Sequence, residues 1–372
     1  MDFNENLKYK IALSLIPKVG PVLAKRLIAY TGSPEAVFRQ SRGSLLKIPN
    51  VGEYLASAIN SVDYLQIAEE EIQFAQKYGI QVSFFTDKSY PDRLKNCEDS
   101  PVILYSKGNV DFSGLKILSV VGTRKPTEGG LEACKNLIQD LAYHNSNLLI
   151  VSGLAYGIDV CAHAAAVEHG LKTVAVLGHG LGMVYPASHR KIAEKIAQEG
   201  ALVSEFRSKT QAVAGNFISR NRIIAGLADA TVVVESGEKG GALITADIAN
   251  SYNRDVFAFP GRVSDKLSKG CNQLIKSNKA ALIESAADLE YVMGWEIHKE
   301  QKRTHQKKLF EELTLQEKEI VELLKEREQV PIDLICSRLN QPTSKVSPIL
   351  LELEFKGLVK TLPGKQYKIV TI

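Results

Sequence analysis

The 372-residue chain contains few cysteines, and no two of its five cysteines form a C-x-x-C pair. Scattered cysteines exclude a disulfide framework and a zinc knuckle, and they favour a reducing cytoplasm. No run of about 18 uncharged apolar residues is present, so we expect no membrane span. The opening residues, MDFNENLKYK, include acidic side chains and no apolar core, which argues against a secretory signal.

The sequence also lacks the short motifs of common cofactor and enzyme classes. The first expected strand is followed by GTRKPTEGG rather than GxGxxG, and no GxxxxGK[ST] occurs, so neither NAD nor ATP is expected in its standard mode. There is no HExxH, no Cys/His cluster with metal-ligand spacing, and no GxSxG around Ser152. We therefore expect no cofactor, no metal and no catalytic residues.

What remains is an ordinary globular composition, with 45% hydrophobic and 24% charged residues. The net charge of +4 permits a nucleic-acid partner without requiring one. Local patterns divide the chain into a helical domain over 1–85, a Rossmann-like domain over 86–293, a linker over 294–310 and a winged helix over 311–372. The predicted fold class is thus α/β, with a mostly parallel sheet between two helical modules.

The N-terminal part carries a short repeat, IPKVGPVLAKRL at 16–27 and IPNVGEYLASAI at 48–59. Each copy places Pro and Gly in a turn and then apolar residues at helical spacing, which is typical of a helix-hairpin-helix or SAM-like domain. In such a turn the glycine lets the backbone approach a phosphate, and Lys18, Lys25 and Arg26 add charge to the first copy. A packed bundle that contacts no DNA explains the same repeat, and both interpretations stay open.

The central part alternates short apolar runs with amphipathic stretches. The expected strands are 116–122, 148–152, 173–178, 201–204, 231–235 and 256–259, and the expected helices are 129–143, 158–169, 188–199, 217–227 and 242–252. This alternation indicates right-handed βαβ units and a mostly parallel sheet. Residues 101–108 are expected to form an edge strand that leads into this domain.

Small residues cluster immediately after the expected strands, where ligands bind in such sheets. These positions are Gly122-Thr123-Arg124, Ser152-Gly153, the glycines of 178–182, and Lys239-Gly240-Gly241. Small residues let an anion reach backbone N–H groups, and Arg124 offers a fork of donors to a phosphate. Since β–α turns need glycine in any case, only the convergence of several turns predicts a polyanion site.

A second candidate segment is FISRNRIIAGL at 217–227. Arg220 and Arg222 flank Asn221 near the start of an expected helix, where positive charge opposes the helix dipole. A bound polyanion would offset that cost, and Phe217 would stack on a base. Alternatively, the arginines pair internally with Glu205 or Glu235 and Phe217 packs in the core. The two interpretations can coexist.

Together these segments resemble the DNA processing protein family known as DprA or Smf. The shared segments are VGTR at 121–124, SGLAYGIDVCAH at 152–163, AVLGHGL at 175–181, FISRNRIIAGL, GGALITADIA at 240–249 and FAFPG at 257–261, with YPDRL and PVILYSKGN upstream. The resemblance implies a cytoplasmic, non-catalytic homodimer that binds single-stranded DNA without strong sequence preference. It also implies protection of incoming DNA during natural transformation and loading of the RecA recombinase.

Matching the family's motifs to this chain places the DNA-binding residues on four turns or segments. They are Gly122, Thr123 and Arg124, then Ser152 and Gly153, then Phe217, Arg220, Asn221 and Arg222, and finally Lys239, Gly240 and Gly241. The last turn departs from the KSG of related chains, which leaves its contacts open.

The C-terminal part predicts a winged helix, with helices over 315–326, 331–340 and 344–357 and strands over 358–362 and 366–371. Thr314 and Glu317 have the spacing of a capping box. The third helix exposes Lys345 and Lys356 beside Glu352 and Glu354, so contact with DNA and contact with protein are both open.

An enzyme of the nucleoside-monophosphate phosphoribohydrolase type is the alternative. Gly240-Gly241 with Thr245 and Asp247 resembles the glycine-rich turn of those enzymes, but no convincing partner carboxylate is evident. Asp159 and His163, four residues apart, are explained by a helix-capping aspartate and a packed histidine.

Overall fold

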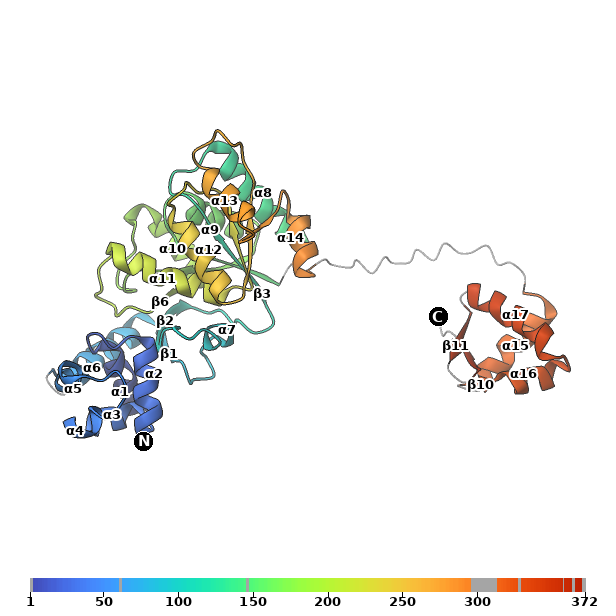
Figure 1. Ribbon diagram of the computed structural model, residues 1–372, viewed down its shortest axis with the longest axis horizontal. Helices are drawn as coiled ribbons and strands as arrows, with labels where there is room; N and C mark the ends of the chain where they lie inside the picture. Colours follow the sequence, from blue (N-terminus) through green and yellow to red (C-terminus); the bar gives the residue numbers. More distant parts are fainter. Residues whose placement is uncertain are drawn as a thin grey trace. The chain divides into compact units, whose positions relative to one another are not determined.

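The computed structural model describes residues 3–59, 62–144, 147–295, 313–326, 329–356, 358–362 and 365–369. The chain forms two compact units, residues 1–297 and 298–372, and each is considered by itself (Figure 1). Within the described residues, no helix combines the length and the apolar character needed to cross a lipid bilayer.

The larger unit is built on a nine-stranded sheet with the order β1-β2-β6-β5-β4-β3-β7-β8-β9. Its parallel part consists of β3 (Lys116–Val121), β4 (Leu148–Ser152), β5 (Lys172–Val176), β6 (Ala201–Ser204), β7 (Ala230–Val233), β8 (Asp255–Ala258) and β9 (Ala281–Leu282). All six strands expected in this part are confirmed, with ends that move by at most two residues. The Rossmann-like sheet is therefore present.

The expected strand within residues 101–108 is confirmed, but its expected position at the edge of the sheet is wrong. These residues contain β2 (Ile103–Gly108), which pairs antiparallel with β6 on one side and with β1 (Ile80–Phe84) on the other. The edge strand is β1, which lies inside the region expected to be helical. Its alternation of Ile80, Val82 and Phe84 is a strand pattern, and Ile80 and Phe84 are buried in the core of the N-terminal helices.

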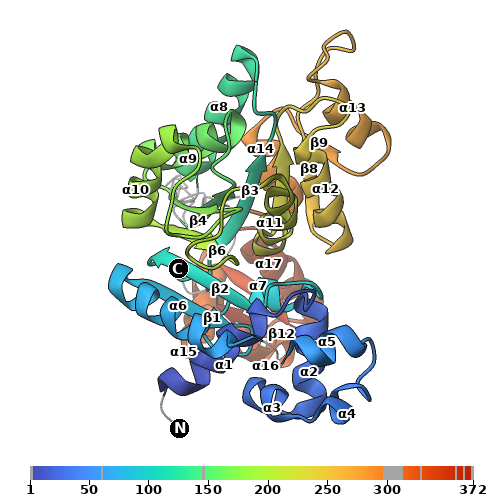
Figure 2. The same cartoon turned by 90° about the vertical axis from the view of Figure 1, so that its left-hand side faces the viewer.

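Helices cover both faces of the parallel sheet, as Figure 2 shows. The helices α8 (Glu128–His144), α9 (Ile158–Glu168) and α14 (Ala286–Met293) share one apolar core with the sheet, and α11 (Ala214–Leu227), α12 (Gly241–Ser251) and α13 (Lys269–Lys276) share another. A third, smaller cluster lies under α10 (Arg190–Glu199). Alternate side chains of β3 enter opposite cores, as burial on both faces requires.

The N-terminal part packs six helices: α1 (Phe3–Leu15), α2 (Pro21–Thr31), α3 (Pro34–Arg39), α4 (Arg42–Leu45), α5 (Glu53–Ala58) and α6 (Tyr64–Tyr78). The repeat takes the same shape twice. The Val19 and Val51 amides donate to the Ile16 and Ile48 carbonyls over 3.1 Å, and the residue before each valine has positive φ. The predicted turn-then-helix repeat is confirmed.

The smaller unit has the predicted winged-helix order, with α15 (Leu315–Glu326), α16 (Ile332–Leu339) and α17 (Thr343–Phe355) followed by β11 (Val359–Leu362) and β12 (Gln366–Ile369). A short strand that the sequence did not indicate, β10 (Val330–Pro331), pairs with β12. Residues 363–364, between the two predicted strands, and most of the predicted linker lie outside the described residues.

The capping box at the start of α15 is confirmed and extends into an ion pair. The Thr314 amide donates to the Glu317 carboxylate over 2.8 Å, and Lys356 Nζ lies 2.6 Å from the other Glu317 oxygen. Glu317 is 2% exposed. Burial acts to raise the pKa of Glu317, but the hydrogen bonds from Lys356 and Thr314 outweigh it and hold the pKa below its usual value.

We expect Glu317→Gln to destabilise α15. Because the pKa of Glu317 is lowered by folding, its ionised form stabilises the unit above the unfolded pKa, and this stabilisation is lost as pH falls through the folded pKa. At neutral pH the opening free energy of α15, measured by native-state hydrogen exchange on the full chain, should fall by about 1–3 kcal/mol.

The matched control is Glu319→Gln, which removes the same charge from an exposed position on α15. It should change α15 opening little. The deficit of Glu317→Gln should shrink toward acidic pH, and a deficit that is independent of pH would refute the ion-pair explanation.

Candidate functional site

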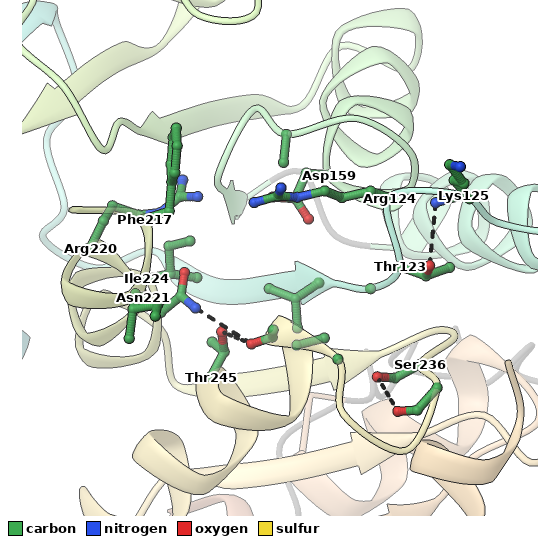
Figure 3. A pocket seen from close by; sticks show the side chains of 18 of the residues that line it. Thr123, Arg124, Lys125, Asp159, Phe217, Arg220, Asn221, Ile224, Ser236 and Thr245 are labelled. Atoms are coloured by element: carbon green, nitrogen blue, oxygen red, sulfur yellow. Dashed lines mark hydrogen bonds between the residues drawn. The ribbon is translucent and has the colours of Figure 1, made fainter. Parts of the chain in front are cut away.

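One pocket of about 860 Å³ opens at the carboxyl ends of β3 and β7. These neighbouring strands are where the order of the sheet reverses, because β4 to β6 lie on one side of β3 and β7 to β9 on the other. Ligands of open α/β sheets bind at such a switch point. Figure 3 shows the pocket walls, which come from the turn after β3, the start of α9, the helix α11 and the start of α12.

Eight of the twelve predicted site residues line this pocket. They are Gly122, Thr123, Arg124, Phe217, Arg220, Asn221, Gly240 and Gly241. The other four, Ser152, Gly153, Arg222 and Lys239, do not line it. The turns after β3 and β7 thus meet at the pocket, whereas Ser152-Gly153 and the glycines of 178–182 do not line it.

Arg124 and Phe217 meet across the mouth of the pocket. The Arg124 guanidinium carbon lies 5.7 Å from the centroid of the Phe217 ring, within the range of a cation–π contact. The Phe217 ring also lies 5.8 Å from the Tyr185 ring, and a Cβ on Gly178 would come within 2.7 Å of it. Phe217 is thus partly used in packing, and it holds an exposed guanidinium over the opening.

Arg220 places a second positive charge in the wall of the pocket. Its side chain is buried, donates to the Val176 carbonyl and fills the space above Gly153, where any Cβ would collide with the guanidinium. Burial lowers the pKa of Arg220 to about 10, and Asp159 opposes that shift. Arg220 therefore stays charged at neutral pH.

Ser152 and Gly153 contribute to the packing behind the pocket wall. The Ser152 hydroxyl is buried and donates to the Val120 carbonyl over 2.6 Å. Gly153 is small because Arg220 occupies the space beside it. In this structure the two residues contact the protein's own interior.

The start of α12 is the open helix terminus at the pocket. In the described part of the chain, no side chain caps its first turn, and a Cβ on Gly241 would meet nothing within 4 Å. Asn221 on α11 donates to the Gly241 carbonyl over 3.4 Å and so connects α11 to α12, while Thr245 donates to the same carbonyl from within α12. The unpaired N–H groups of such a terminus favour an anion. Lys239 is exposed on the preceding turn.

The start of α8 is closed by contrast. The Glu235 carboxylate accepts from the Thr127 amide over 2.9 Å and from the Thr127 hydroxyl over 2.5 Å, and it lies against Gly130. A carboxylate of the chain thus already occupies that helix terminus.

Arg222 points away from the pocket and pairs internally, as the alternative interpretation allowed. It forms an ion pair with Glu205 and donates to the Asp99 carbonyl over 2.5 Å. Burial raises the pKa of Glu205, and Arg222 opposes that shift. Arg222 therefore anchors α11 to the loop that carries Asp99.

Asp159 and Tyr185 are among the pocket residues that the sequence analysis did not assign to the site. Asp159 is 7% exposed, and its carboxylate accepts from the backbone amides of Ala155 and Gly153. Burial raises its pKa, with Arg220 and Arg124 acting in the opposite direction. The available sequence signal was the position of Asp159 shortly after the segment SGLAYG, but the sequence pattern explains Asp159 as a helix-capping residue.

His163 is a packed histidine, as expected. It is buried, its Nδ1 lies 2.7 Å from the Thr173 hydroxyl, and burial lowers its pKa to about 3. Among the described residues, no group of three or more histidine, cysteine or acidic side chains is arranged to hold a metal ion.

The cationic side chains of the N-terminal repeat all contact the chain itself. Lys18 Nζ lies 4.4 Å from the Tyr54 ring centroid, Lys25 donates to the Glu98 carbonyl over 2.8 Å, and Arg26 donates to the Pro49 carbonyl over 3.3 Å. These contacts favour the packed-bundle interpretation of the repeat.

The N-terminal part reaches the pocket through one buried carboxylate. Glu71 on α6 accepts from the Ser208 amide over 2.6 Å and from the Ser208 hydroxyl over 2.8 Å, and both residues are buried. Ser208 belongs to the loop between β6 and α11, which carries the pocket residue Ala212 and leads into the pocket residue Ala214 at the start of α11. Glu71 thus holds one wall of the pocket, although 137 residues separate it from Ser208.

Comparison with known proteins gives matches over both units. The family model for DNA recombination-mediator protein A matches residues 81–293, and the model for the DprA winged-helix domain matches residues 307–365. Protein Smf of Synechocystis sp. is 36% identical over 299 residues, which cover 78% of this chain and 73% of that protein.

Two solved structures are also similar to the chain. DNA processing protein A of Streptococcus pneumoniae superimposes with a TM-score of 0.67 at 31% identity, over 76% of this chain and 97% of that one. DNA processing protein A of Helicobacter pylori, described with a single-stranded DNA binding mode, gives 0.52 at 27% identity, over 58% of this chain and 96% of that one.

We expect Glu71→Ala to loosen the loop between β6 and α11. Removing both acceptors leaves the buried Ser208 amide and hydroxyl unpaired, which costs about 1–3 kcal/mol. Hydrogen exchange at Ser208 and the following amides should accelerate by about 5- to 150-fold, since 1.4 kcal/mol corresponds to tenfold.

Glu70→Ala is the control, because Glu70 is exposed on the same helix and lies 3.6 Å from Lys209 at the surface. Its exchange pattern should match that of the unaltered chain. Equal acceleration in both variants would contradict a specific role for Glu71.

Proposed function

The chain belongs to the DNA recombination-mediator protein A (DprA) family, and we propose on that basis that its pocket binds single-stranded DNA. The observation that carries the proposal is the convergence of Arg124, Arg220 and the open start of α12 on one pocket at the switch point of the sheet. The H. pylori relative, which is described with single-stranded DNA, supports the choice of ligand.

Phosphate contacts account for binding without strong sequence preference. Arg124 is exposed and supplies the donors nearest to the solvent, while the buried charge of Arg220 and the terminus of α12 add positive potential deeper in the pocket. These groups act on the phosphate backbone, which is the same for every sequence. The modest net charge of +4 makes local placement more important than overall charge.

Single strands fit this site better than duplexes. A duplex buries its base faces in its own stack, whereas an unpaired strand can present both phosphate and base to a pocket with aromatic walls. Phe217 and Tyr185 provide such walls beside Arg124.

The wider role proposed here is that of a recombination mediator in DNA processing. The chain would protect incoming single strands during natural transformation, act as a homodimer and deliver the strand to the RecA recombinase, without catalysing a reaction itself. These roles follow from family membership.

The alternative, a phosphoribohydrolase activity, requires a carboxylate that faces a ribose. Asp247, the carboxylate considered for it, lies outside the pocket lining, is half-exposed and pairs with Lys279 over 2.8 Å. Asp159 does line the pocket, but its carboxylate accepts from backbone amides of its own turn. This arrangement favours binding over hydrolysis.

We expect Arg124→Ala to weaken binding of labelled oligothymidylate by about 10- to 100-fold, since a charge-assisted hydrogen bond contributes about 1.5–3 kcal/mol. Titrations over a range of salt concentrations should show a smaller slope, because each lost phosphate contact reduces it by about 0.7 for single strands. Duplex of equal length, measured alongside, should bind more weakly to the unaltered chain.

The control is Arg39→Ala, which removes a guanidinium that is 71% exposed on α3, outside the pocket. Its affinity and salt slope should match those of the unaltered chain. Unchanged affinity and slope for Arg124→Ala would refute the assignment of the pocket, and release of free base from nucleoside monophosphates would favour the enzyme instead.

A further inference from the structure

Two exposed tyrosine rings lie beside the pocket, in the segments that follow the strands β4 and β5. Tyr156 follows β4 and is 49% exposed, while Tyr185 follows β5 and is 47% exposed. The order β5-β4-β3-β7 places both turns on the same side of β3. Tyr185 lines the pocket itself, and Tyr156 directly follows the pocket residue Ala155.

We propose that Tyr156 and Tyr185 form a stacking platform for the bases of a single strand whose phosphate is held at Arg124. The proposal rests on the proposed function and extends it beyond the pocket, by assigning the path of the strand and a second class of contact. A base presents a flat π-face whatever its identity, so such a platform tolerates any sequence.

Both rings are held in place before any ligand arrives. The Tyr156 ring packs edge-on against His189 with 4.9 Å between centroids, and the buried His189 lies 2.9 Å from the Leu154 carbonyl through its Nδ1. The Tyr185 ring lies 5.8 Å from the Phe217 ring, and the Tyr185 backbone amide donates to His179 Nε2 over 3.2 Å. Rings fixed in this way lose little conformational entropy when a base stacks on them.

Phe217 is less available for this task than the sequence suggested. Its ring already contacts the Arg124 guanidinium, the Tyr185 ring and Gly178. The exposed aromatic surface beside the pocket therefore belongs to the tyrosines.

Positive charge at both ends of the platform favours a polyanion over an apolar partner. Arg124 and Lys125 line the pocket at one end, and Arg190 and Lys191 are exposed at the start of α10, immediately beyond the turn that carries Tyr185. The first turn of α10 contains no acidic residue, so its two cations oppose the helix dipole. Alternating cations and aromatic rings are the pattern of single-strand binding surfaces.

The experiment measures binding of two 12-residue probes by fluorescence anisotropy, oligothymidylate and an oligomer of the same length with abasic sugars throughout. Tyr156→Ala should weaken oligothymidylate binding by about 10-fold, which corresponds to about 1.4 kcal/mol and to the loss of one stacked base. On the abasic probe, Tyr156→Ala and the unaltered chain should bind equally. The salt slope should not change, in contrast to Arg124→Ala.

Two further variants separate stacking from other effects. Tyr156→Phe keeps the ring and should retain full affinity. Tyr143→Ala removes a ring that is 82% exposed near the end of α8, and it should bind both probes as the unaltered chain does. Tyr185→Ala repeats the test at the second ring should Tyr156→Ala fail to fold.

Each outcome bears on the proposal. If the unaltered chain binds neither probe, the proposed function fails and the platform with it. If the chain binds oligothymidylate and Arg124→Ala weakens that binding, but Tyr156→Ala does not, the pocket stands and the platform is wrong. An equal loss on both probes would also overturn it, because the ring would then act without a base.

Discussion

The buried guanidinium of Arg220 is the constraint on which the pocket depends. A charge that is 3% exposed is tolerated only where the protein compensates for lost water. Here the Val176 carbonyl accepts a hydrogen bond from it and the Asp159 carboxylate favours its charged form, while its Nε has no hydrogen-bond partner among the described residues. Making room for that side chain requires a glycine at position 153. Arg220 thereby fixes α11 relative to the turn after β4 and the carboxyl end of β5. The positions of these elements determine the shape of the pocket.

Glycine at the strand ends consequently serves packing at least as much as ligand approach. Gly122 lies against the Ile158 side chain, Gly178 against Phe217 and Gly240 against the Ser236 hydroxyl. Gly241 differs, because the space above it is open and it begins the uncapped helix α12. A glycine-rich turn therefore indicates a close approach of the backbone to another group. The sequence does not distinguish whether that group is a side chain of the same protein or a ligand.

This distinction explains how far the sequence could predict the fold and the site. The alternation of apolar runs predicts six of the seven parallel strands, and the strand-end rule predicts that Gly122, Arg124 and Gly240 share one site, as the pocket lining confirms. The orientation of Arg222 was open, because its partners Glu205 and Asp99 are set by tertiary packing. Glu205 was one of the partners that the sequence suggested, but local patterns carry no information about pairings as distant as Arg222 with Asp99 or Glu71 with Ser208. Antiparallel pairing of β1 and β2 was missed because β1 follows a long helical stretch directly.

The contrast between paired and unpaired cations separates structural from binding residues. Arg222 pairs with Glu205, which lies on the loop before its own helix, and Arg93 pairs with Asp229, which is 136 residues away. Arg124, within the described part of the chain, has no ion-pair partner and instead rests on an aromatic ring. A guanidinium held by a π-face keeps its N–H donors available. The cations of the N-terminal repeat, in contrast to Arg124, contact polar or aromatic groups of the N-terminal part or the neighbouring loop, and the N-terminal helices support the loop between β6 and α11 through Glu71.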